Sequence, residues 1–267
     1  MSAGDLPPSA AGGAVPPAAG DRLKSVAAGD VAAAVRRAAG TNPLLAIGLD
    51  RDAGAPASGL RAAGAGVDDV AADLVDRVAA RLGTGERRVA ASMVVLGYAA
   101  RLVGPAVAAL LREDLLLDLR PENVRFAYDP PGGFTVVLVR WAGWRGDRSA
   151  LRRRWCETVV DDHLGLLVNA VRARVPVAAP LLWGNVASGL AGALRAVASG
   201  GTVAHSATPA RCYADGRYLL NHGPLRGSGD LTLDDGQLRF VRRSCCLYYR
   251  LDGGGMCGDC VLLHRRR

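Results

Sequence analysis

The sequence predicts a helix-rich α+β fold with two β-hairpins and a cysteine-bearing loop near its C-terminal end. Three observations lead to this prediction. Apolar residues recur at helical spacing in several long segments, alternating residues flank two strong turn sequences, and four of the six cysteines lie within residues 245–260. A chain of 267 residues is long enough to bury a core without disulfide bonds.

The N-terminal part is expected to begin as an unstructured leader. Residues 1–20 are rich in Ala, Pro and Gly, and they have neither the basic start nor the apolar stretch of a signal peptide. Residues 21–39 have the composition of a helix. Residues 41–66, rich in Gly, Ala, Pro and Asp, predict a loop.

The next two segments have helical periodicity. Within 67–82, apolar residues repeat at helix spacing, Asp68 and Asp69 lie in the first turn, where the helix dipole favours acids, and Gly83 follows as a stop. Residues 89–111 predict a second, mostly buried helix. Gly104 and Pro105 are expected to break or kink it.

Two hairpins and three further helices are expected after residue 120. Alternating residues on both sides of the turn sequence 129–133 predict the first hairpin, and those around 234–236 predict the second. Between them, apolar positions predict helices over 151–171 and 180–199, and a shorter one over 209–220. Pro180 suits a first helical position, and Gly200 and Gly201 end that helix.

Composition limits the possible partners. The net charge is +8, which permits acidic partners, but no stripe of basic and aromatic residues indicates nucleic acid. The most apolar stretch, 89–111, carries Arg101 near its middle, so we expect no integral membrane segment. The arginines are expected on solvated helix faces, and without a signal peptide the protein is predicted to be cytoplasmic.

The cysteines near the C-terminus form the strongest motif. Cys245 and Cys246 are adjacent, and ten residues separate them from Cys257, which precedes Cys260 by three positions. In a reducing compartment, clustered cysteines indicate metal or redox chemistry. Four thiolates match the ligand number of a [2Fe–2S] cluster. Because neighbouring strand residues point to opposite faces, the adjacent pair must leave strand geometry to bind one centre.

A structural zinc site is the alternative for these four cysteines. Zinc sites of this type usually place two to four residues between the members of each pair, which the adjacent pair does not. The remaining cysteines, Cys156 and Cys212, fall in predicted helices, where a cysteine commonly serves as a small hydrophobic residue.

Segments 242–250 and 253–260 resemble the C-terminal signature of FhuF-like ferric-siderophore reductases, and the segment 183–188 (WGNVAS) resembles another part of that family. The resemblance implies a [2Fe–2S] cluster bound by Cys245, Cys246, Cys257 and Cys260. It also implies one-electron reduction of a ferric siderophore, of hydroxamate type, in the cytoplasm. We therefore expect three parts: a leader (1–20), a helix-rich siderophore-reductase-like domain (21–229) and a [2Fe–2S]-binding segment (230–267) packed on it.

Several further residues are candidates for the surroundings of this cluster or for the substrate. Arg242, Arg243 and Arg250 flank the cysteines directly. From residue 236 onward the chain contains seven arginines and two aspartates, so this part carries a net positive charge. Trp183 and Asn185 come from the WGNVAS segment. A substrate surface is expected between helix 180–199 and the cysteine loop.

An external electron donor is expected, because the chain lacks a credible nucleotide or flavin fingerprint; a ferredoxin or a reductase would serve. Two other functions remain open. The chain could be a zinc-stabilised binding module, or a [2Fe–2S] electron carrier without a siderophore site. The length of the chain before the cysteines argues against a simple carrier.

Overall fold

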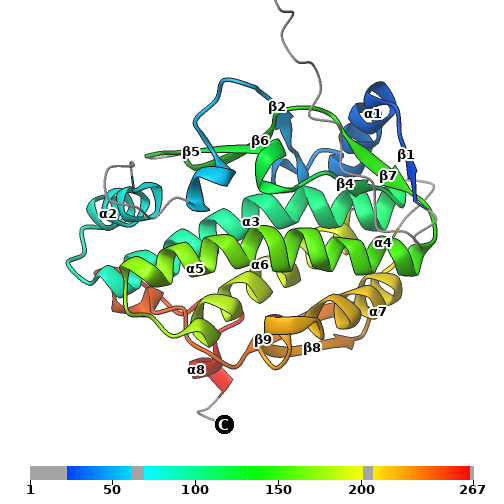
Figure 1. The fold of residues 1–267 in the computed structure, drawn as a ribbon. Helices are drawn as coiled ribbons and strands as arrows, with labels where there is room; N and C mark the ends of the chain where they lie inside the picture. Colours follow the sequence, from blue (N-terminus) through cyan, green and yellow to red (C-terminus); the bar gives the residue numbers. More distant parts are fainter. Residues whose placement is uncertain (1–22, 62–68, 131, 201–206, 265–267) are drawn as a thin grey trace, which may run out of the picture.

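A computed structural model describes residues 23–61, 69–130, 132–200 and 207–264. Figure 1 shows three layers, with small sheets and α1 (Ala28–Ala39) above, and long helices in the middle. Below the helices lie α7 (Pro209–Leu220), the hairpin of β8 (Gly229–Asp234) and β9 (Gln237–Arg242), and the segment that carries the cysteines. The predicted helix-rich α+β class is confirmed.

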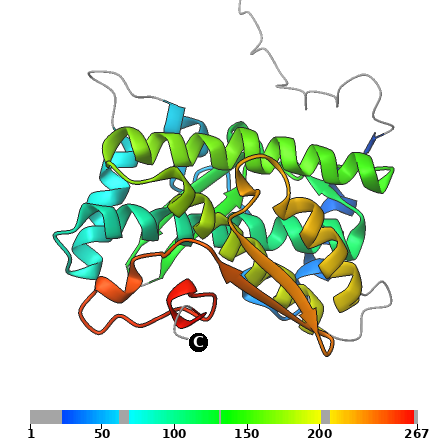
Figure 2. The ribbon, with the colours of Figure 1, turned by 90° about the horizontal axis from the view of Figure 1, so that it is seen from below.

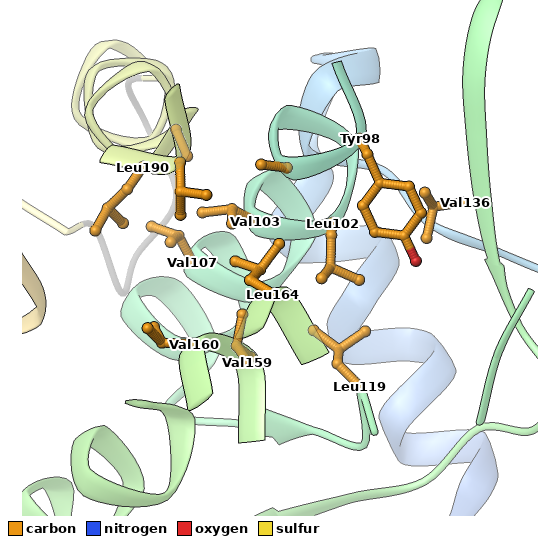
Figure 3. Packing of buried hydrophobic residues seen from close by; sticks show 14 of the residues in the cluster. Tyr98, Leu102, Val103, Val107, Leu119, Val136, Val159, Val160, Leu164 and Leu190 are labelled. Atoms are coloured by element: carbon orange, nitrogen blue, oxygen red, sulfur yellow. The ribbon is translucent and has the colours of Figure 1, made fainter. Parts of the chain in front are cut away.

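Helix α3 (Arg87–Glu113) forms the centre of the molecule. It runs beside α6 (Ala179–Ser199) in the same direction, since Ser92 contacts Asn185 near one end and Arg112 contacts Val197 near the other. Figure 3 shows the core that its apolar residues form with the neighbouring helices and with β6 (Gly133–Leu138). Burial of this apolar surface is the main stabilising contribution to the fold.

Gly104 and Pro105 do not break α3, because the helix continues to Glu113. The predicted break is therefore wrong, and the predicted alternative, a kink, stays a prediction. Gly104 serves a packing purpose instead. A Cβ atom there would lie 2.1 Å from the carbonyl oxygen of Leu44, which belongs to the short 3₁₀ helix η1 (Pro43–Leu45). Glycine therefore allows this backbone to approach the helix.

The predicted helix 151–171 is part of a longer helical rod. Asp147 caps α4 (Arg148–Trp155), which continues through a π-helical stretch, η4 (Cys156–Leu164), into α5 (Gly165–Arg174). This rod lies across the front of the helical layer (Figure 1). The π-helical stretch has no signal that we recognised in the sequence.

The first predicted hairpin is confirmed as β5 (Val124–Asp129) and β6, paired antiparallel from Val124 with Leu138 to Asp129 with Gly133. Two short strands extend it, β2 (Gly48–Leu49) parallel to β6 and β3 (Ala55–Pro56) antiparallel to β5. Together with η1 and η2 (Ala57–Arg61), these strands lie within residues 41–66, which were predicted as a loop. That prediction was therefore wrong in part.

A second small sheet was not predicted. It has the strand order β1 (Lys24–Ser25), β7 (Gly143–Arg145), β4 (Leu116–Leu117). Strands of two or three residues are too short to show a repeating pattern, so only their partners reveal them. A 3₁₀ turn, η3 (Pro121–Asn123), leads into β5.

The remaining helices follow the predictions closely. Helix α2 (Val70–Leu82) is capped by the Asp69 side chain and ends at Gly83, which has a positive φ of 62°. Helix α6 has Pro180 in its first turn, and α7 begins at Pro209. Helix α1 starts only at Ala28; residues 21 and 22, in the segment predicted as helical, lie outside the described residues, as does the leader 1–20.

Not every arginine lies on a solvated face as predicted. Arg112 is buried and donates hydrogen bonds to the carbonyl oxygens of Ala38 and Val197, at 2.6 and 2.8 Å. These carbonyls belong to the last turns of α1 and α6, where helix dipoles favour a cation. The guanidinium group therefore ties three helices together.

The second predicted hairpin is confirmed, with Leu231 opposite Phe240 and Leu233 opposite Leu238. A short turn, η5 (Gly223–Leu225), precedes it. Residues 243–264, which we call the cysteine segment, then run in the lowest layer of Figure 1 through η6 (Tyr248–Arg250) to α8 (Val261–His264). In the view from below, this segment lies on the side of the molecule away from the rod of α4 and α5 (Figure 2). The division of the chain at residue 230 stays a prediction.

Helices α3 and α6 are long and apolar enough to cross a membrane by length and composition. Within the described structure, 78% of the most apolar window of α3 and 72% of that of α6 are buried against other elements. Core helices of soluble proteins meet the same criterion, so this finding is weak evidence for a membrane span.

Candidate metal centre

The backbone leaves strand geometry where the two adjacent cysteines occur, as the motif requires. Strand β9 ends at Arg242, and Leu247 has a positive φ of 66°, which is uncommon for a leucine. This turn brings the Leu247 N–H to 3.3 Å from Cys245 Sγ, where it can donate a hydrogen bond to the sulfur. Such N–H···S bonds stabilise a thiolate ligand.

The second pair of cysteines returns to the first. Cys257 Sγ lies 4.0 Å from Cys246 Sγ, although eleven positions separate the residues. Thiolates on one tetrahedral metal with bonds of about 2.3 Å would lie about 3.8 Å apart. Cys260 follows in a turn in which its N–H donates to the Cys257 carbonyl, at 3.0 Å.

The four sulfur atoms form one electrostatic group. Burial raises the pKa of Cys245, and the neighbouring thiols of Cys246 and Cys260 raise it further. Burial, followed by the charge and hydrogen bond of Cys246, raises the pKa of Cys257 to about 11. Thiolates so close together repel one another unless cations compensate them, which favours a positively charged centre between them.

Within the described residues, no three His, Cys, Asp or Glu side chains are arranged to hold a metal ion. The thiols are neighbours rather than a closed coordination sphere. The donor set nevertheless fits an iron–sulfur cluster: one sulfur of each cysteine pair lies 4.0 Å from a sulfur of the other pair, a backbone N–H points at Cys245, and a cation lies nearby.

That cation is Arg242, whose side chain is only 1% exposed. Its charge lowers the pKa of both Cys245 and Cys257, opposing the effect of burial. Its guanidinium donates to the Ser244 carbonyl oxygen at 2.8 Å and to Asn185 Oδ1 at 2.6 Å. In the described part of the chain, it forms no ion pair with a carboxylate. A buried charge with only neutral partners is costly, so a nearby anion would stabilise it.

Asn185 relays this contact to α3. Its side-chain nitrogen donates to the Ser92 carbonyl oxygen at 2.7 Å, and the Ser92 hydroxyl donates to the Cys246 carbonyl oxygen at 2.6 Å. Arg242, Asn185, Ser92 and the Cys246 backbone therefore form one buried chain of hydrogen bonds, which we call the Arg242 relay. It fixes the first cysteine pair against both central helices.

Ser92 is a site residue that was not predicted from the sequence. A signal was present, since Ser92 is a polar residue within the apolar stretch 89–111, and in the structure it is completely buried. A single serine in a helix is commonly satisfied by its own helix, so the sequence could not show that it bonds to a cysteine backbone.

Further contacts attach the cysteine segment to the helices. Arg250 in η6 pairs with Glu86, which precedes α3, at 3.2 Å. Asp259 pairs with Arg195 on α6 at 3.1 Å, and its carbonyl oxygen accepts from the Arg242 N–H. Gly184 lies so close to Ser244 that a Cβ atom there would come within 2.2 Å of the hydroxyl.

The remaining predicted residues lie in the core or on the surface. Trp183 is buried in the core, one residue from Gly184. Arg243 lies on the surface and pairs with Asp230 at 2.8 Å, with its side chain 61% exposed. Arg250 is likewise exposed. Of the three arginines, Arg242 alone is buried beside the thiols.

Cys156 and Cys212 lie buried in helices, and burial raises their thiol pKa values to about 12 and about 11.

A pocket of about 240 Å³ borders Cys257. Its walls come from η1, α3 and α6, and its end is formed by Arg242, Cys257 and Asp259. It lies between α3 and α6 and reaches the cysteine segment at Cys257 and Asp259. The substrate surface expected between α6 and the cysteine segment stays a prediction.

Comparison with known proteins agrees with this geometry. The family described as "Ferric iron reductase FhuF-like transporter" matches residues 92–227. The "FhuF 2Fe-2S C-terminal domain" matches residues 242–262, which include all four clustered cysteines. The cofactor of this C-terminal region is therefore a [2Fe–2S] cluster.

One curated relative is the ferric siderophore reductase of Escherichia coli (strain K12). It is 28% identical over 170 residues, which are 62% of this chain and 62% of the relative. The match therefore spans less than two thirds of each protein.

Proposed function

This chain belongs to the FhuF-like ferric iron reductase family, and from that membership we propose that it reduces ferric siderophores in the cytoplasm and releases Fe(II). Cys245, Cys246, Cys257 and Cys260 hold the [2Fe–2S] cluster. The observation that carries this proposal is the convergence of the two cysteine pairs, with Cys246 and Cys257 sulfurs 4.0 Å apart beside a buried arginine.

When bound, the cluster supplies one electron at a time. Siderophores hold Fe(III) through hard oxygen donors. One electron converts Fe(III) to Fe(II), whose lower charge weakens those bonds and speeds ligand exchange, so the metal leaves the chelator. An external donor, a reduced ferredoxin or a reductase, returns the electron to the protein.

This chain's residues have three tasks in that reaction. The cysteine thiolates anchor the electron source, and two of them, Cys245 and Cys257, are partly exposed. The Arg242 relay fixes the Cys246 backbone and places a positive charge beside the sulfurs. The cysteine segment also bears the exposed apolar side chains Tyr248, Tyr249 and Met256, which suit contact with a substrate or donor.

The proposed substrate is a hydroxamate siderophore, and the proposed donor is an acidic ferredoxin or a reductase. The chain's net charge of +8 favours an acidic donor. Hydroxamate complexes of iron lack the high negative charge that would repel them from an anionic cluster.

A single-turnover experiment tests the proposal. Protein reduced with dithionite, and freed of excess reductant without oxygen, is mixed with a ferric hydroxamate in the presence of an Fe(II) chelator. We expect one Fe(II) per reduced cluster, formed at the rate at which the cluster absorbance returns. The same siderophore loaded with Ga(III), which cannot be reduced, should leave the cluster reduced.

Two outcomes would favour the alternatives. A cluster that is reduced reversibly but never accelerates iron release would indicate an electron carrier. A colourless protein with one zinc ion, after attempted cluster reconstitution, would indicate a zinc-stabilised binding module.

A further inference from the structure

We infer that the pocket between α3 and α6 binds an uncharged hydrocarbon arm of the siderophore, while the chelated iron stays outside the pocket near Cys257. This inference rests on the proposed function and identifies the part of the substrate that the protein recognises. The pocket qualifies because its lining includes both Cys257 and the apolar surfaces of α3 and α6.

The shape of the pocket suits a chain. On α6 it extends from Ser188 to Ala196, a rise of about 12 Å along the helix axis. Small residues form this wall, and at Gly192 a Cβ atom would meet nothing within 4 Å. Leu96 on α3 and Leu44 and Leu45 in η1 form the opposite sides. The cavity is therefore elongated and apolar along its length.

The charges at one end are already compensated. Asp259 pairs with Arg195, and Arg242, whose hydrogen-bond partners are neutral, lines the pocket together with Cys257, so the cluster that the cysteines hold is the anion that balances it. Neither charge requires a charged ligand. Burying a charged group in the apolar remainder would be costly, whereas a hydrocarbon chain gains free energy by leaving water.

The volume of the pocket limits the size of the group that it can bind. An apolar cavity of about 150 Å³ accepts benzene, so 240 Å³ accommodates a chain of several carbons but not a whole iron chelate. Binding the arm would hold the chelate at the surface beside the cysteine segment. This arrangement would allow recognition of the arm without desolvating the iron complex.

Binding of Ga(III)-loaded siderophores to the holoprotein tests the inference without turnover. Two hydroxamates with the same chelating groups are compared by calorimetry, one with and one without a hydrocarbon arm. We expect wild type to bind the armed compound at least tenfold more tightly. Gly192→Leu, which fills the pocket, should remove this difference in affinity. Its affinity for the compound without an arm and the midpoint potential of its cluster should equal those of wild type.

Two further variants control for misfolding and for general effects of leucine. Leu44→Glu changes a residue that is 51% exposed and lines the pocket. This variant should also lower the affinity for the compound with the hydrocarbon arm and leave the affinity for the other compound unchanged. Gly29→Leu alters a helical glycine in α1 that, like Gly192, has open space around it, and it should bind both compounds as wild type does.

Equal binding of the two compounds by wild type would overturn the inference, as would Gly192→Leu and Leu44→Glu variants that still prefer the armed one. These results differ from failure of the proposed function. In that case, reduced wild-type protein would release no iron from either siderophore, whatever its binding preference.

Discussion

At the scale of a single residue, the charge of Arg242 should influence the cluster more strongly than the charge of its neighbour Arg243. Both lie within three positions of Cys245, but Arg242 is 1% exposed while the Arg243 side chain is 61% exposed and pairs with Asp230. Water screens an exposed charge strongly, and a buried one far less. Since reduction adds a negative charge to the cluster, the buried arginine should stabilise the reduced state.

We therefore predict that Arg242→Gln lowers the midpoint potential of the cluster, whereas Arg243→Gln leaves it almost unchanged. A tenfold change in the one-electron equilibrium corresponds to about 59 mV, and a shift of that order is expected for Arg242→Gln. Redox titration monitored by electron paramagnetic resonance measures both variants. Equal shifts would show that burial of Arg242 has no special effect on the cluster.

The predicted site residues show where sequence reasoning reaches its limit at this scale. The four cysteines were identified because their chemistry and spacing are unusual. Arg242, Arg243 and Arg250 were equivalent candidates, because the sequence shows that they flank the cysteines but not which of them is buried. In the structure, its burial and its hydrogen bonds to Asn185 and Ser244 separate Arg242 from the other two.

At the scale of secondary-structure elements, the contacts of α3 explain both what was predicted and what was not. Long apolar periodicity identified the helix, but Gly104 and Pro105 suggested a break or a kink. The tertiary contact with Leu44 accounts for the glycine, and such a contact leaves no trace in local sequence. The two-residue strands β1, β2, β3 and β4 escaped prediction for a similar reason, because their pairing is the only evidence for them.

Two glycines on the central helices should respond in opposite ways to the same substitution. A Cβ atom at Gly104 would lie 2.1 Å from a backbone carbonyl oxygen, so Gly104→Ala should destabilise the fold by about 1–3 kcal/mol through overpacking. At Gly192 the space is open, so Gly192→Ala should stabilise α6 by about 0.5–1 kcal/mol.

Urea unfolding of the two glycine variants measures these changes. If Gly104→Ala were as stable as wild type, the Leu44 carbonyl oxygen would not lie close enough to Gly104 to exclude a Cβ atom.

At the scale of the whole molecule, a buried polar pair lies in the core between α3 and the helical rod. The Leu119 carbonyl oxygen accepts from His163 Nδ1 at 2.6 Å, so Nε2 accepts from the Tyr98 hydroxyl at 2.7 Å. Burial lowers the pKa of His163 to about 4, so the ring is neutral in the fold at neutral pH, which agrees with Nε2 acting as an acceptor. Its ordinary pKa of about 6.5 applies to the unfolded chain.

This difference predicts how stability depends on pH. As the pH falls from about 6.5 to 4, the unfolded state takes up a proton at His163 and the native state does not, so stability decreases by about 3 kcal/mol. Above pH 6.5 this contribution is fully present. The free energy of unfolding at neutral pH and at about pH 5 should therefore differ less in His163→Gln than in wild type.

His222 provides the control, because it lies partly exposed beside Asp161. If His222→Gln reduced the pH dependence as much as His163→Gln, the buried histidine would not be its source.

The central claim is that Cys245, Cys246, Cys257 and Cys260 hold a [2Fe–2S] cluster. It is tested most directly by iron, sulfide and zinc analysis of protein purified without oxygen, with spectra before and after dithionite. The account predicts two irons and two sulfides per chain, bleaching on reduction and a one-electron paramagnetic signal, all lost when any of the four is changed to alanine and kept in Cys156→Ala. A colourless protein with one zinc, or an intact cluster in any of the four variants, would contradict it.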